Sequence, residues 1–257
     1  MFTAIHTTPV AQRESGMLAM WWRLAVLGAI GTASLILAPI ERLVPVPIDP
    51  LALRAVSMIQ PAILMMLMAA LGLWAAPKLG LDVPVVRAWA EGKNLWPALR
   101  PQLVPAVLAG LAVAVVLVAF ASYLRTQPVA APLITFEMPL ITRLLYGGIV
   151  EELLLRWGIM SLFVWLAWRA SGARRPVPSW CVWTGLSAAA LLFAVGHLPA
   201  LHLLLPDPPT WLIGMVLTAN FLPGLLFGWL FWRRGLEAAI GAHALAHLVG
   251  WAALAIA

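Results

Sequence analysis

Charged residues are scarce in this chain. They make up 10% of its 257 residues, whereas 63% are hydrophobic and the mean hydropathy is +0.96. A soluble domain carries roughly a quarter charged residues. This shortage excludes an ordinary soluble domain and predicts an all-α, polytopic integral membrane helix bundle.

Cysteine is almost absent as well. Cys181 is the single one and stands in an apolar run, which excludes a disulfide within one chain.

The net charge of +6 does not predict a nucleic-acid partner, because the arginines stand in short segments between apolar runs. We expect the lipid bilayer as a partner and no nucleic acid. We expect no cleaved signal peptide, because residues 1–16 are polar and the run that follows is long enough to span.

Long apolar runs are abundant, and a helix needs about 20 such residues to cross the hydrocarbon. Seven runs qualify, at roughly 18–40, 54–76, 102–124, 138–169, 179–201, 211–232 and 235–256. Pro61 is expected to kink the second. The segment 80–98 would add an eighth only by re-entering the membrane, and its tryptophans and basic residues favour the interface. We therefore expect a polar N-terminal segment at 1–17 and one membrane domain at 18–257.

The basic residues outside the spans predict an orientation. One group of connecting segments holds Arg13, Lys78, Arg87, Lys93, Arg100, Arg169, Arg174, Arg175, Arg233 and Arg234. The alternate group holds Arg42, Arg54 and Arg125. The positive-inside rule places the first group and the N-terminus in the cytoplasm, and the C-terminus outside. Compact loops and the residue usage favour a prokaryotic inner (cytoplasmic) membrane.

Few ionisable residues fall deep inside the expected spans, and such residues are costly in lipid and mark functional sites by default. They are Glu151, Glu152, Arg156, His197, His243 and His247. These six residues are the candidate site.

The stretch EELLLR separates into two parts by helical phase. Residues four apart lie about 40° apart around a helix, so Glu152 and Arg156 share a face and can form an ion pair. Such a pair can be purely structural. Glu151 is displaced by about 100° from Glu152 and has no partner on its own helix. A free carboxylate there is suited to act as a general base.

The histidines stand on two further spans. Phe193 and His197 in FAVGH are four residues apart, so the phenyl ring can pack on the imidazole. His243 and His247 in HALAH also share a face, at a spacing that zinc-binding helices use. A single histidine in an apolar span is usually a hydrogen-bonded core residue. Three histidines and a free glutamate on three spans together favour a site.

The ordered motifs EExxxR, FxxxH and HxxxH resemble those of the CAAX protease and bacteriocin-processing (CPBP or Abi) family of intramembrane proteases, which is related to type II CAAX prenyl endopeptidases. The resemblance covers about residues 139–250. His247 stands where the family usually has asparagine, and Trp157 stands where relatives often have glycine.

The resemblance implies an intramembrane endopeptidase that cleaves a membrane-associated peptide or protein. By this likeness Glu151 is the base, His197 helps to hold the water, Arg156 holds Glu152, and His243 stabilises the oxyanion. We expect no cofactor. Zinc is the alternative, with His197, His243, His247 and Glu151 as the available ligands.

Two other functions remain open from the sequence. A non-proteolytic scaffold or bacteriocin-immunity protein could keep the same residues for structure. A metal or proton transporter would instead spread acidic and histidine groups along a path across the bilayer. Asn220 in the sixth span either lines the cavity or bridges two helices by a hydrogen bond, and interhelical asparagine contacts are the commoner case.

Overall fold

The computed structural model describes residues 10–256, so His6, the first half of the polar N-terminal segment and Ala257 lie outside the described residues. Within residues 10–256 the regular elements are all helical, and the all-α prediction is confirmed. The long helices are α1 (Val10–Ala33), α3 (Ile59–Leu79), α5 (Trp96–Arg125), α9 (Ser179–Val195), α11 (Thr210–Arg234) and α12 (Leu236–Ala255). The shorter ones are η1 (Ser34–Leu37), η2 (Ile40–Arg42), α2 (Pro50–Ser57), α4 (Pro84–Ala90), η3 (Pro128–Ala130), α6 (Ala131–Thr135), α7 (Leu140–Thr142), η4 (Arg143–Glu151), η5 (Leu153–Met160), α8 (Ser161–Ala170) and α10 (Leu198–Leu204).

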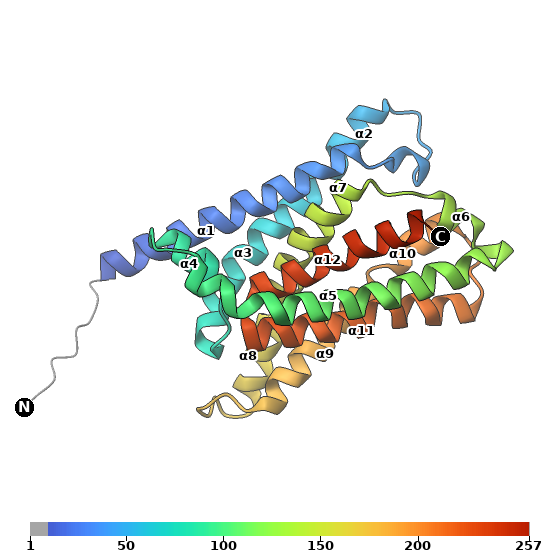
Figure 1. Cartoon of the computed structure of the whole chain (residues 1–257). Helices are drawn as coiled ribbons and strands as arrows, with labels where there is room; N and C mark the ends of the chain where they lie inside the picture. Colours follow the sequence, from blue (N-terminus) through green and yellow to red (C-terminus); the bar gives the residue numbers. More distant parts are fainter. Residues whose placement is uncertain (1–9, 257) are drawn as a thin grey trace, which may run out of the picture.

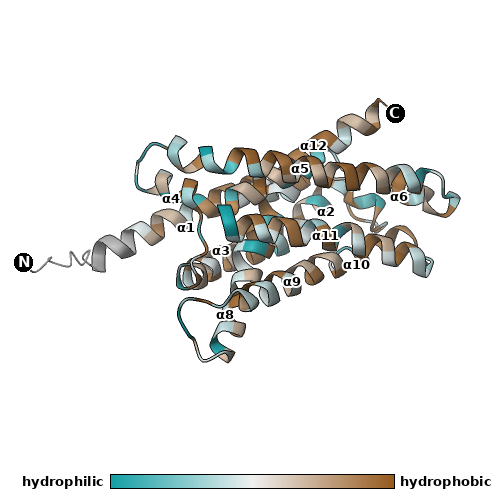
Figure 2. Cartoon of the chain, turned by 60° about the horizontal axis from the view of Figure 1, so that its bottom comes forward, coloured by the Kyte–Doolittle hydropathy of each residue, from teal (hydrophilic) through white to brown (hydrophobic). Residues whose placement is uncertain are grey.

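Six helical segments are long and apolar enough to cross a membrane. They are Gly16–Leu37, Pro50–Leu79, Trp96–Arg125, Ser179–Leu204, Thr210–Arg234 and Leu236–Ala255. Each overlaps a predicted span, and in Figure 2 the long helices carry most of the hydrophobic colour. The predicted fourth span is helical from residue 140 to residue 170 but is not among the six, so the count of seven is not confirmed.

The second span breaks where proline chemistry requires it. Pro61 lies in the first turn of α3 and has no N–H to donate to the carbonyl of Ser57. Accordingly α2 ends at Ser57, and Met58 separates it from α3. The predicted kink is therefore an interruption three residues before the proline.

The segment 80–98 adds no spanning helix. It holds α4, which has seven residues, and the first turn of α5. Seven helical residues cover about 10 Å, a third of the hydrocarbon thickness. The eighth span that this segment could have supplied is therefore not formed.

The bundle brings the candidate helices together in its interior. Helix α12 packs along α5, η4 and α11, and α9 packs against α11 and η5. Figure 1 shows α12 and α11 running beside α5 through the middle of the bundle. The motif histidines of α12 therefore lie against the π-helical segments that carry the glutamates.

The bundle has two distinct ends, which we name the α4 end and the α6 end. At the α4 end, Leu236 N–H donates to Asp82 O over 3.1 Å, which joins the start of α12 to the segment before α4. At the α6 end, Arg125 donates to Leu254 O over 3.1 Å, which joins the last turns of α5 and α12. In Figure 1 α4 and the α8–α9 connection lie at one end, and α6, α10 and the C-terminus at the other.

Candidate functional site

The two adjacent glutamates lie where the helix between residues 140 and 170 is π-helical. Glu151 is the last residue of η4, and Glu152 connects it to η5. π-Helical turns are rare and frequently occur at functional sites. The α-helical phase used on the sequence therefore holds only approximately in this segment.

Glu152 and Arg156 form the predicted ion pair, which is confirmed. Arg156 Nη1 lies 3.0 Å from Glu152 Oε1, and the two side chains are 2% and 0% exposed. Arg156 Nη2 also donates to Gly224 O of α11 over 3.2 Å. The guanidinium lies over the rings of Phe193 and Phe227, at 4.9 and 5.5 Å from their centroids. These contacts fix the pair between three helices, away from solvent.

His243 joins both glutamates. Its Nδ1 donates to Glu152 Oε1 over 2.8 Å, because a carboxylate oxygen can only accept. Its Nε2 lies 3.9 Å from Glu151 Oε2 and 3.2 Å from His247 Nε2. The imidazole also stacks on Phe227, with centroids 4.8 Å apart. The sequence separated the two glutamates by direction, but the structure places one histidine in reach of both.

His197 is held by the motif phenylalanine. Its Nδ1 lies 2.8 Å from Phe193 O, and a carbonyl accepts, so Nδ1 carries the proton and Nε2 keeps its lone pair. The Phe193 ring packs edge-on against the imidazole at 4.8 Å, which confirms the predicted i, i+4 contact. His197 occupies the turn after α9, and α10 continues the chain from Leu198 with Pro199 in its first turn. A proline is tolerated there because first-turn N–H groups have no intrahelical acceptor.

One cavity of about 360 Å³ contains the candidate site. Its walls include Glu151, His197, His243 and His247, which come from η4, the α9–α10 turn and α12. Glu152 and Arg156 are not among its lining residues. Four of the six predicted residues thus face a common cavity. The other two, Glu152 and Arg156, form a buried pair, and Glu152 accepts a hydrogen bond from His243.

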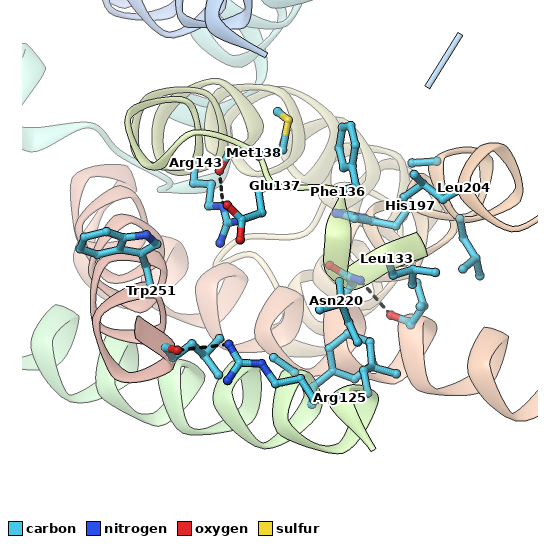
Figure 3. Close-up of a pocket in the computed structure, with 18 of the residues that line it drawn as sticks. Arg125, Leu133, Phe136, Glu137, Met138, Arg143, His197, Leu204, Asn220 and Trp251 are labelled. Carbon is cyan, nitrogen blue, oxygen red and sulfur yellow. Dashed lines mark hydrogen bonds between the residues drawn. The ribbon is translucent and has the colours of Figure 1, made fainter. Parts of the chain in front are cut away.

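A second cavity of about 640 Å³ adjoins the first towards the α6 end. Both are lined by Arg143, His197, Asn220 and Trp251, so the two spaces are continuous. Figure 3 shows these side chains directed into the outer space, together with Glu137 and Arg125. A long substrate segment could therefore reach the inner site from the outer cavity.

Asn220 hydrogen-bonds within its own helix and lies on the walls of both cavities. Its amide Nδ2 donates to Val216 O of its own helix over 2.8 Å, and the residue lines both cavities. Of the two alternatives, the structure therefore favours the position on the cavity wall. An asparagine in an apolar helix can donate to the carbonyl four residues earlier on its own helix. It then does not need the interhelical hydrogen bond that is common for asparagine in membrane helices.

Gly147 and Gly148 contribute to the site but were missed in the sequence. A Cβ on Gly147 would lie 3.2 Å from His247 Nε2, and one on Gly148 would lie 3.0 Å from Ala244 Cβ. The two glycines therefore let η4 approach α12 closely enough for the glutamates to reach His243. The signal was available, because each glycine precedes a glutamate by four residues and so shares its face.

Trp157 follows the motif arginine but does not face the site. Its ring is 1% exposed, and Nε1 donates to Ala69 O of α3 over 3.1 Å. Gly72 leaves room for it, since a Cβ there would lie 2.3 Å from the indole. The tryptophan therefore anchors η5 to α3, and its ring also packs edge-on against Phe231 of α11.

The metal-ligating side chains meet only in part. His243 Nε2 and His247 Nε2 are 3.2 Å apart, close to the separation of about 3.3 Å that two imidazoles adopt on one tetrahedral zinc. Among residues 10–256, however, no three His, Cys, Asp or Glu side chains converge tightly enough to hold a metal as they stand. The donor set fits a two-histidine site with Glu151 as a third ligand only after a small movement.

Comparisons with known proteins agree with the site. The family model of the Rce1-like type II CAAX prenyl endopeptidases matches residues 133–249, a little under half of the chain. The searches of curated proteins and of solved structures gave no match. The matched segment contains all six candidate residues and both π-helical segments. Residues 133–249 of this membrane protein therefore resemble the CAAX protease family.

Proposed function

We propose that the protein is an intramembrane endopeptidase that hydrolyses a peptide bond of a membrane-associated peptide or protein. The observation that carries this proposal is the common cavity of Glu151, His197, His243 and His247, inside a bundle of helices able to span a membrane. The match of residues 133–249 to a family of proteases supports the same conclusion. A shared enclosed space favours catalysis over transport, because a transport path needs polar groups at successive depths.

Glu151 is proposed to activate the attacking water. Its side chain is 23% exposed and faces the cavity, and it lies 3.9 Å from His243 Nε2 without touching it. A separation of that size leaves room for a bridging water. His197 presents an unprotonated Nε2, since Phe193 O accepts the proton on Nδ1, and it can accept a hydrogen bond from the same water. These two groups would orient the water and remove its proton.

His243 and His247 are proposed to stabilise the oxyanion. Glu152 accepts from His243 Nδ1 and holds the ring so that Nε2 faces the cavity, where the Nε2–H of an imidazolium would donate to the developing negative charge. His247 Nε2 lies 3.2 Å from that nitrogen and can supply a second donor, as an asparagine amide would. Donors of this kind typically contribute about 3–4 kcal/mol to transition-state stabilisation.

The proposed reaction balances without a covalent enzyme intermediate. The water oxygen bonds to the peptide carbonyl carbon, and its proton passes to Glu151. When the C–N bond breaks, the protonated Glu151 returns this proton to the leaving amine. The second proton of the water stays on the new carboxyl group and passes to solvent or to the new amine, so the products are a carboxylate, an amine and one proton, and Glu151 is again ionised.

The proposed setting is a prokaryotic inner membrane with the N-terminus in the cytoplasm. The six apolar helices make the chain an integral membrane protein. The orientation rests on the basic residues at the α4 end, as developed below.

A terminus survey tests the function. Membranes from cells that produce the wild type should contain new peptide termini that are absent when His197→Ala is produced. His202→Ala is the matched control, because His202 is exposed on α10 and its Nδ1 contacts the carbonyl oxygen of Pro206, away from the candidate site. If His197→Ala and wild type yield the same termini and the same phenotype, the scaffold or immunity function is correct instead.

We propose that Glu151 activates water without a metal. The support is that, among residues 10–256, no three His, Cys, Asp or Glu side chains converge closely enough to hold a metal. Protein purified in the presence of a chelator should keep full peptidase activity and contain no stoichiometric zinc. Loss of activity that added zinc restores would establish the metal-dependent alternative.

A further inference from the structure

The outer cavity lies at the α6 end of the bundle. Its lining comes from the last turns of α5, from α6 and the segment before α7, from α10, and from the last turns of α12. All of these belong to the α6 end. Figure 3 shows Glu137, Arg143 and Arg125 around the space, with Trp251 of α12 on one side. The cavity that adjoins the inner site therefore lies on its α6 side.

The basic residues concentrate at the opposite end. Of the 16 lysines and arginines, 11 belong to the α4 end, 4 to the α6 end, and Arg156 is buried between them. Those at the α4 end are the ten of the first group above together with Arg23, which lies over the Trp89 ring of α4 at 5.0 Å. Those at the α6 end are Arg42, Arg54, Arg125 and Arg143.

This asymmetry sets the side from which substrate arrives. An excess of basic residues in short connecting segments marks the cytoplasmic side of a membrane protein. All connections at the α4 end are short, so the rule applies to them without the exception made for long translocated domains. We propose that the catalytic cavity opens to the extracytoplasmic side and that the substrate is a peptide segment exposed on that side.

The substrate class follows, and this step rests on the proposed peptidase function. The scissile bond must lie in a chain that has already crossed or spans the membrane, such as an exported peptide or the outer flank of a membrane helix. The outer cavity holds both signs of charge, at Arg143 and Glu137, beside apolar walls. A partly polar juxtamembrane segment matches that lining better than a wholly apolar one. Cytoplasmic chain ends would have no route to Glu151.

Cysteine labelling tests the side of the opening without requiring activity. The wild type provides the background, because its single cysteine, Cys181, is 0% exposed. Thr126→Cys places a thiol beside the outer cavity at the α6 end, and Glu91→Cys places one at the α4 end. Both positions are exposed, so neither substitution disturbs packing.

A membrane-impermeant maleimide applied to intact cells should label Thr126→Cys and not Glu91→Cys, and both should react after permeabilisation. Labelling of Glu91→Cys in intact cells, or any other pattern, overturns the proposal. Correct labelling with no difference in peptide termini between wild type and His197→Ala would leave the opening established and refute the peptidase function alone. The two ideas therefore fail separately.

Discussion

Glu151→Gln should lower the turnover number for a membrane-anchored peptide by roughly a thousandfold, within the range that general acid–base groups contribute. The amide has almost the same shape as the carboxylate but cannot take a proton from water. Glu151 Oε2 lies 3.9 Å from His243 Nε2, beyond hydrogen-bond distance, so the substitution breaks no direct hydrogen bond among the described residues. Turnover should fall while substrate affinity and stability stay close to those of the wild type. Purified protein in lipid bilayers with a fluorogenic lipid-linked peptide supplies the measurement.

Glu91→Gln is the matched control for this prediction. Glu91 is an exposed carboxylate in the α4–α5 connection, where its only ion-pair partner is Lys93. The control should keep wild-type turnover. If Glu151→Gln retained more than a tenth of the wild-type rate, Glu151 would not be the base and the proposed mechanism would be wrong.

The positions of the helices along the chain were largely predictable, because hydropathy and proline chemistry act locally. Each of the six candidate spans overlaps an expected one, and the helix break near Pro61 follows from the missing N–H. The ion pair and the Phe193–His197 contact were also predictable, because both are i, i+4 neighbours on one helix. In these cases a periodic rule within one helix determines the outcome.

The contacts between helices were not predictable in the same way. The π-helical turns shift the phase of Glu151, and the hydrogen bond from His243 to Glu152 joins residues 91 positions apart. No periodic rule within a helix reaches across that distance. Gly147 and Gly148 carried a usable signal, since small residues one turn before two carboxylates indicate a close helix approach. The end of the bundle at which the outer cavity lies could not be predicted from the sequence, because the cavity is formed by several helix ends that meet only in the folded protein.

Arg156→Met should destabilise the folded protein by about 3–5 kcal/mol, the typical cost of leaving one partner of a buried ion pair uncompensated. Arg156 is 2% exposed, and its partner Glu152 has no exposed surface. Without the guanidinium, Glu152 keeps only the hydrogen bond from His243, and Gly224 O loses its donor. Titration with a denaturing detergent should detect the loss as a lower unfolding midpoint.

The double variant Glu152→Gln/Arg156→Met separates the two roles of the pair. Removing both charges should recover a large part of the lost stability, since a buried pair is often replaceable by neutral groups. Peptidase turnover should stay low, because a glutamine cannot stabilise an imidazolium at His243 through Nδ1. If turnover recovered together with stability, Glu152 would serve packing alone. Stability without turnover would instead assign Glu152 to the positioning of His243, the residue that links the buried pair to the cavity.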